Sequence, residues 1–116
     1  MALSLGVAET VAKVGDTSQI YTLNLYDDEM DLYLTEDYAP EDIEVRVANE
    51  QGQYLFSTDA SDIVITDDDT ISVLGTKLAN QPAGLYQFEV RLKNDDDTET
   101  IFPTGARPVV RLVGSI

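Results

Sequence analysis

Cysteine and histidine are both absent from this chain of 116 residues, and each absence removes a class of chemistry. Without cysteine the chain has neither disulfide bonds nor thiolate metal ligands, and it shows no adaptation to an oxidising compartment. Without histidine no serine has an imidazole base, so triad catalysis is excluded. Catalysis by a carboxylate pair needs shifted pKa values, whereas the acidic clusters lie in predicted turns. We therefore expect a protein that is not an enzyme and that uses no cofactor.

Basic residues are scarce, since 7 lysines and arginines stand against 22 acidic residues and leave a formal net charge of -15. Such a chain repels phosphate backbones, so nucleic acid is not expected as a partner. Arg46 is the only basic residue between Asp16 and Asp69, whereas four basic residues gather toward the C-terminus. These four are Arg91, Lys93, Arg107 and Arg111. One interpretation is that this uneven charge lets one end of the domain attract the opposite end of a neighbouring copy. The alternative is that the acidic surface only keeps the protein soluble.

Long apolar runs are missing too. No stretch approaches the length of a membrane span, and no basic residue precedes Lys13 in the manner of a signal peptide. We expect no membrane association and synthesis in the cytosol. A chain of this length forms one domain, burying roughly two-thirds of the surface exposed when unfolded. Residues 1–116 are therefore expected to be one β-sandwich domain, with residues 1–16 as a candidate N-terminal arm.

Alternation of apolar and polar residues dominates the remaining pattern, as in Tyr21, Leu23 and Leu25, which share one face of an extended segment. Turn formers at residues 49–52 and 94–97 predict two hairpins. We expect strands over residues 18–26, 31–35, 41–48, 53–57, 62–66, 70–74, 85–93, 98–102 and 109–113. Eight or nine short strands predict an all-β fold, an antiparallel immunoglobulin-like β-sandwich with Greek-key connections.

The sharpest local signal is the sequence Pro82-Ala83-Gly84 directly ahead of a strand whose apolar positions begin at Tyr86. Tyr86 follows Gly84 by two positions, as in the tyrosine corner of immunoglobulin-like sandwiches. Two other stretches stay ambiguous. Residues 3–14 fit a helical stripe or an extended arm, of which we favour the arm, and residues 76–81 fit a single helical turn.

Two acidic triplets are candidate calcium sites, because calcium takes oxygen ligands from carboxylates on loops. The weak candidate ligands are Asp67, Asp69, Asp95 and Asp97. Neither triplet has the spacing of an EF-hand loop. The alternative is that aspartate forms turns here and blocks edge-to-edge strand pairing, so no metal is assigned.

Tyrosine is enriched, with 6 residues against 3 phenylalanines. The apolar phase of their strands predicts that Tyr21, Tyr54 and Tyr86 pack in the core. Tyr33 and Tyr38 flank acidic residues on a predicted loop and are candidates for partner contacts. The basic residues Arg107 and Arg111 are the other candidate partner contacts.

The order of segments resembles the N-terminal domain of upper baseplate proteins from phages of Gram-positive bacteria. The resemblance begins with Ala12-Lys13-Val14-Gly15-Asp16-Thr17, a strand, an acidic turn and Met30-Asp31-Leu32-Tyr33-Leu34. It continues with Ile43-Glu44-Val45-Arg46-Val47, Ile65-Thr66-Asp67, Ile71-Ser72-Val73 and Ala83-Gly84-Leu85-Tyr86, and closes with Arg111-Leu112-Val113-Gly114-Ser115-Ile116. The family has no catalytic residues to carry over.

The resemblance implies a structural part of a phage or prophage tail tip, made in the bacterial cytoplasm and incorporated into the virion. Its partners would be other baseplate or tail proteins, with several copies arranged as a homo-oligomer around a tail hub and supporting receptor-binding proteins. Two alternatives remain open. One is a bacterial immunoglobulin-like adhesion or carbohydrate-binding module that uses exposed tyrosines and calcium. The other is an acidic mimic of nucleic acid, although its carboxylates cluster at turns instead of following phosphate spacing.

Overall fold

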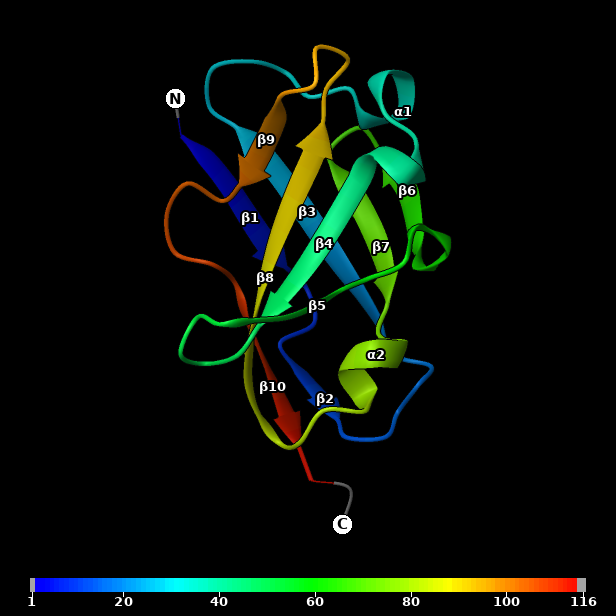
Figure 1. The fold of residues 1–116 in the computed structure, drawn as a ribbon, viewed down its shortest axis with the longest axis vertical. Helices are drawn as coiled ribbons and strands as arrows, with labels where there is room; N and C mark the ends of the chain where they lie inside the picture. The colour runs from blue at the N-terminus through cyan, green and yellow to red at the C-terminus, as the bar shows by residue number, and fades with distance from the viewer. Residues whose placement is uncertain (1, 115–116) are drawn as a thin grey trace.

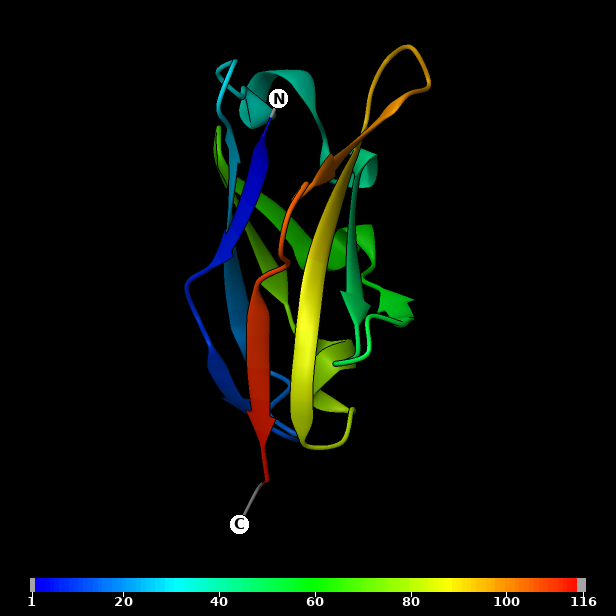
Figure 2. The same ribbon diagram turned by 90° about the vertical axis from the view of Figure 1, so that its left-hand side faces the viewer.

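The computed structural model describes residues 2–114. The strands form two sheets, which pack against each other through their apolar faces (Figures 1 and 2). The first sheet has the order β1-β3-β7-β6. Its strands are β1 (Leu3–Val7), β3 (Ile20–Asp27), β6 (Ile63–Asp67) and β7 (Thr70–Leu74). The second sheet has the order β2-β10-β8-β4-β5, and β9 pairs with β8. Its strands are β2 (Val11–Lys13), β4 (Ile43–Ala48), β5 (Tyr54–Ser57), β8 (Gly84–Lys93), β9 (Glu99–Phe102) and β10 (Val109–Val113).

Every strand pair is antiparallel except β2 and β10, which run parallel. The N-terminal segment therefore contributes β1 to one sheet and β2 to the other. Glu9 lies at the crossing, where its carboxylate accepts hydrogen bonds from the Thr22 backbone N–H at 2.5 Å and the Thr22 hydroxyl at 3.2 Å. Residues 3–7 and 11–13 of the predicted arm are thus extended and paired, not helical. The architecture is an all-β, immunoglobulin-like sandwich, as predicted.

Within residues 2–114, four short helical turns connect the strands. They are α1 (Leu34–Asp37), η1 (Pro40–Asp42), η2 (Ala60–Asp62) and α2 (Thr76–Ala79). The helical turn expected within residues 76–81 is confirmed by α2. No helix among the described residues is long and apolar enough to cross a membrane.

The strand predicted over residues 31–35 is wrong, because α1 begins at Leu34 instead. Leu34 is fully buried, and its backbone N–H donates to the carbonyl oxygen of Asp68 at 3.0 Å. Thr35 also donates from its N–H and its hydroxyl to the Asp68 carboxylate. Contacts with the distant β6–β7 turn therefore determine the conformation here, while the apolar residues of this stretch suit either structure.

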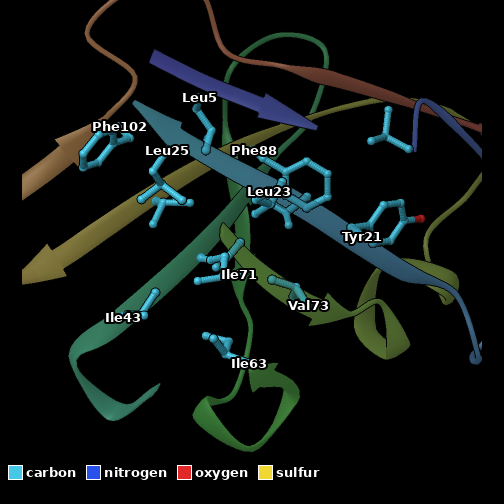
Figure 3. Packing of buried hydrophobic residues seen from close by; sticks show 14 of the residues in the cluster. Leu5, Tyr21, Leu23, Leu25, Ile43, Ile63, Ile71, Val73, Phe88 and Phe102 are labelled. Carbon is cyan, nitrogen blue, oxygen red and sulfur yellow. The ribbon is translucent and has the colours of Figure 1, made fainter. Parts of the chain in front are cut away.

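The core lies between the sheets and takes side chains from nearly every strand (Figure 3). Tyr21 and Phe88 pack across it with ring centroids 5.4 Å apart, and Phe102 of β9 is fully buried in it. Tyr21 and Tyr86 are buried as predicted, with 1% and 4% of their surfaces exposed. The prediction that Tyr54 is buried is wrong, since 45% of this residue is exposed.

The predicted tyrosine corner is confirmed at the start of β8. The Tyr86 hydroxyl donates a hydrogen bond of 2.5 Å to the carbonyl oxygen of Pro82. Gly84, between them, has a φ of 156°. The corner turns the chain from α2 into the central strand of the larger sheet, and it fixes which side chains of β8 point outward.

Candidate docking face

The basic residues gather on the outer face of the larger sheet, on the side away from the core. In β8 the residues Tyr86, Phe88, Val90 and Leu92 are buried, so Arg91 and Lys93 point outward. The same alternation turns Lys13, Arg46 and Arg111 outward, and the Arg107 guanidinium lies over the Tyr54 ring on this side. Six of the 7 basic residues therefore share one face.

We call this surface the arginine face, and it consists of the outward side chains of β2, β4, β5, β8, β9 and β10 together with Arg107. Its charged members are Lys13, Glu44, Arg46, Glu89, Arg91, Lys93, Glu99, Arg107 and Arg111. Six positive charges thus stand against three negative ones, although the chain as a whole carries -15. The arginine face therefore differs in sign from the rest of the molecule.

Opposite charges alternate across the arginine face. In the register of β4 and β8, Glu44 pairs with Arg91 and Arg46 pairs with Glu89. Ion pairs also run along each strand, from Arg46 Nε to Glu44 Oε1 at 2.6 Å and from Arg91 Nε to Glu89 Oε2 at 3.2 Å. Opposite charges in neighbouring strand positions stabilise a sheet and hold long side chains in place. The guanidinium groups are therefore preordered.

Glu89 is the centre of this arrangement and the only buried charged side chain among residues 2–114, with 6% of the residue exposed. Its Oε2 accepts a hydrogen bond of 2.8 Å from the Tyr54 hydroxyl, and its Oε1 lies 3.6 Å from Arg107 Nη2. Arg107 Nη2 also donates to the Tyr54 hydroxyl at 2.9 Å. A buried charge needs such partners, and here two arginines and a tyrosine supply them.

Tyr54 lies outward because β5 contains a bulge. Val47 pairs with Phe56 and the next residue, Ala48, pairs with Tyr54, so Leu55 is an extra residue. The bulge puts Tyr54 and Phe56 on opposite sides of the sheet, although they are two positions apart. The guanidinium carbons of Arg46 and Arg107 lie 5.2 Å and 5.0 Å from the Tyr54 ring centroid. The ring is therefore engaged by cations within its own chain, which disfavours its use for stacking on a sugar.

An open cleft of about 350 Å³ adjoins the arginine face, between η1 and the upper part of β8 and β9. Its lining combines the basic residues Arg46, Arg91 and Lys93 with acidic residues that include Glu41 and Asp42. Exposed apolar groups extend the face elsewhere. Tyr54, Leu55, Val11 and Val109 are between 42% and 57% exposed. Arginine and tyrosine beside scattered apolar groups form the usual composition of a protein interface.

The four predicted partner contacts do not form one surface. Arg107 and Arg111 both belong to the arginine face. Arg107 is tied to Tyr54 and Glu89, whereas the Arg111 side chain is exposed and makes no hydrogen bond or ion pair with residues 2–114. Tyr33 and Tyr38 lie instead at the end of the sandwich that carries α1. The prediction that these four residues bind a partner stays a prediction.

Most of the negative charge lies at that same end (Figure 1, top), which we call the acidic end. It consists of the connections at residues 27–42, 67–69 and 94–97, and these hold 14 of the 22 acidic residues and no basic one. They are Asp27, Asp28, Glu29, Asp31, Glu36, Asp37, Glu41, Asp42, Asp67, Asp68, Asp69, Asp95, Asp96 and Asp97. Nearly two-thirds of the carboxylates thus come from three connections.

Tyr38 shows the effect of the acidic end on a neighbouring group. Its hydroxyl donates to Asn94 Oδ1 at 2.6 Å and joins two of the connections. Burial, together with the charges of Asp37, Asp95 and Asp42, raises the pKa of Tyr38. Tyr38 is therefore partly a structural residue, since its ring also packs against the core.

The candidate calcium ligands lie in two separate turns of the acidic end. Asp67 and Asp69 flank the β6–β7 turn, and Asp95 and Asp97 belong to the β8–β9 turn. Several neighbouring carboxylates accept hydrogen bonds within these turns. Asp96, for example, accepts from the Thr98 hydroxyl at 2.6 Å, and this bond lowers its pKa. Within residues 2–114 no group of three or more acidic side chains converges to hold a metal ion, and calcium binding stays a prediction.

Neither protein-family models nor curated protein sequences match this chain. Among solved structures, the adhesin domain of Epf from Streptococcus pyogenes is similar, with a TM-score of 0.47 and 15% identity over 97% of this chain. Pectate lyase Pel3 from Pectobacterium carotovorum has a TM-score of 0.43 and 12% identity over 94%. The M1 domain from titin has a TM-score of 0.40 and 17% identity over 99%. This chain spans 33% of the adhesin chain, 26% of the lyase chain and 96% of the titin chain.

Proposed function

We propose that this chain is an assembly module that docks on another protein through the arginine face. The observation that carries the proposal is the gathering of six of the 7 basic residues on that face of a chain with a net charge of -15. A face of opposite sign to the rest of the molecule orients an approaching partner and disfavours the wrong approach. The partner surface is accordingly acidic or neutral.

The central cluster of the arginine face supports docking over a purely structural role. Glu89 holds Tyr54 and Arg107 in fixed positions, with Arg91 beside them. Tyrosine and arginine dominate binding energy at interfaces when they are rigid before the partner arrives, because less conformational entropy is then lost. Exposed Leu55 and Val109 near this cluster add apolar area that a partner would bury.

The specific form that we propose is a component of a phage or prophage tail tip. It rests on the resemblance of the sequence to the N-terminal domain of upper baseplate proteins. In that setting the arginine face would dock on the tail hub or on another baseplate protein. The absence of histidine and cysteine supports binding rather than catalysis as the role of the module.

The first experiment asks whether the protein is part of a particle. Phage particles from induced cultures of the natural host are purified and labelled with antibody against this chain. We expect label at the tail tip in electron micrographs. Particles that infect normally and contain none of this chain would contradict the tail-tip form of the proposal, while docking through the arginine face would remain open to the second experiment.

The second experiment maps the docking surface. The tail protein that copurifies with this chain is titrated with the wild type and with the double variant Arg46→Ser, Arg107→Ser. We expect binding to weaken at least about tenfold, since interface arginines often contribute 2 kcal/mol or more, about 1.4 kcal/mol being a factor of ten. The control is Val64→Ser, which removes an exposed apolar side chain from the outer face of the other sheet. Equal affinities for the arginine double variant and the wild type would exclude this face.

A further inference from the structure

Three exposed large apolar side chains lie together at the acidic end, and two of them are the most exposed of their kind among residues 2–114. Tyr26, at the end of β3, is 62% exposed, and Met30 and Tyr33, in the following connection, are 72% and 45% exposed. Apolar groups exposed singly are normal, but a contiguous group marks a surface that contacts another molecule. These three side chains line one open groove of about 350 Å³.

The groove is built on fixed backbone. Leu25 donates from its N–H to the carbonyl oxygen of Asp69 at 2.8 Å, and Leu34 donates to that of Asp68 at 3.0 Å. Leu34 is fully buried and Leu32 packs against the core. The connection that carries Met30 and Tyr33 is therefore held at both of its ends by the sandwich. A partner would meet a surface that is largely ordered before binding.

The walls of the groove are aromatic and acidic at once. Asp27, Asp31 and the acidic residues of the β6–β7 turn line the groove together with the two tyrosines, and no residue that lines it is basic. Within residues 2–114 no three acidic side chains converge on one point of the groove. A guanidinium or ammonium group on an aliphatic stem fits well, because aromatic faces and carboxylates attract the cation and a methionine thioether contacts the stem.

We propose that this groove binds a lysine or arginine side chain presented by a basic protein segment. The chemistry of the walls selects the cation, and the 14 carboxylates of the acidic end attract the segment that carries it. The groove lies on a different surface from the arginine face and does not depend on docking there. The module therefore has two binding surfaces of opposite charge, one for an acidic or neutral partner and one for a basic segment.

The test is a calorimetric titration of the full chain with a short arginine–glycine peptide, compared with a glutamate–glycine peptide of equal length. We expect binding of the basic peptide only, and weaker binding at physiological than at low ionic strength, where the screening length is longer. The double variant Tyr26→Ser, Tyr33→Ser should bind about tenfold more weakly, because each exposed cation–π contact contributes about half to one kcal/mol and about 1.4 kcal/mol is tenfold. The matched double variant with phenylalanine should bind as the wild type does.

Equal affinity of the serine variant and the wild type would overturn the proposal, because binding would then come from diffuse charge alone. If the serine variant is poorly folded, Asp31→Asn in the loop gives an independent measurement and should weaken binding about two- to fivefold. Unchanged affinity in that variant would count equally against the groove. Self-association of the chain that the serine variant abolishes would also overturn it, because the occupant would then be a folded second copy of this chain and not a basic segment of another protein.

Discussion

The hydroxyl of Tyr86 donates a hydrogen bond of 2.5 Å to the carbonyl oxygen of Pro82, and this bond closes the corner that leads into β8. Tyr86→Phe removes the donor and leaves the carbonyl without this partner. We expect a loss of about 1–2 kcal/mol in the free energy of unfolding, measured by urea denaturation. Tyr26→Phe, at an exposed tyrosine, is the control and should change it by less than about 0.5 kcal/mol. Equal stability of the Tyr86 variant and the wild type would show that the corner is not stabilised by this bond.

Gly75 makes room for the most deeply packed tyrosine. A β-carbon at Gly75 would lie 2.5 Å from Cε2 of Tyr21 and 3.3 Å from the carbonyl oxygen of Gln19. The φ of Gly75 is -88°, so an alanine suits the backbone and only the crowding opposes it. We expect Gly75→Ala to lower the free energy of unfolding by about 1–3 kcal/mol, which is measured as a lower midpoint of thermal unfolding. Gly6→Ala, where nothing lies within 4 Å, should be neutral, and equal losses in the two variants would argue against crowding.

Glu89 should contribute more to stability than the equally charged Glu44 across the same sheet. The Glu89 side chain is 8% exposed and holds Tyr54, Arg91 and Arg107, whereas the Glu44 side chain is 40% exposed. Glu89→Gln should lower the free energy of unfolding by about 2 kcal/mol or more, because it leaves two partly buried guanidinium groups without their counter-charge. Glu44→Gln should cost less than about 1 kcal/mol. The two variants are compared by urea denaturation. Similar losses in the free energy of unfolding would mean that Glu89 is effectively solvated.

Alkaline pH should destabilise the sandwich through Tyr21. Burial, with the charges of Asp16 and Glu9 adding to it, raises the pKa of Tyr21 from 10.0 to about 12. The folded state holds this proton more tightly than the unfolded chain does. Its contribution to stability is therefore complete below about pH 10 and is lost as the pH rises toward 12.

Thermal unfolding followed across this pH range checks the effect. The unfolding temperature should fall less steeply in Tyr21→Phe than in the wild type. Part of the fall should remain, because burial also raises the pKa of Tyr86 and of Tyr38. Parallel curves for the variant and the wild type would exclude Tyr21 as a source of the alkaline instability.

Much of the fold could be predicted from local pattern. The segment from Pro82 to Leu92 predicts a corner and a core strand, and both are present, with Tyr86 and Phe88 buried. Turn formers at residues 49–52 and 94–97 predict two hairpins, and both are confirmed. These features depend on residues close together in sequence. The period of two in a strand and the backbone preferences of turns are sufficient to predict them.

Features that depend on distant contacts could not be predicted. Alternation predicts that Tyr54 and Phe56 share a face, but the bulge at Leu55 separates them, and a bulge is visible only in the pairing with β4. Leu34 begins a helix because Asp68, far along the chain, accepts its backbone hydrogen bond. The parallel pairing of β2 with β10 is likewise non-local. In each case the local sequence is compatible with two structures.

The arginine face could not be predicted from the sequence for a similar reason. Its six basic residues are spread from Lys13 to Arg111, and only the strand order brings them to one side. The excess of basic residues near the C-terminus predicted only the part of the arginine face that these residues form. Arg46 and Lys13 join the others because β4 lies beside β8 and β2 lies beside β10. The acidic end, by contrast, could be anticipated, since its carboxylates come from three continuous stretches.

The parallel pairing of β2 and β10 gives the sandwich a mechanical property. When tension pulls on the chain ahead of Val11 and beyond Val113, the two strands are drawn past each other along their length. The hydrogen bonds from Arg111 N–H to the Thr10 carbonyl and from Val14 N–H to the Val113 carbonyl, both 2.9 Å, lie across this direction. We expect them to break together, in shear, whereas the bonds of a hairpin pulled open at its ends break one at a time.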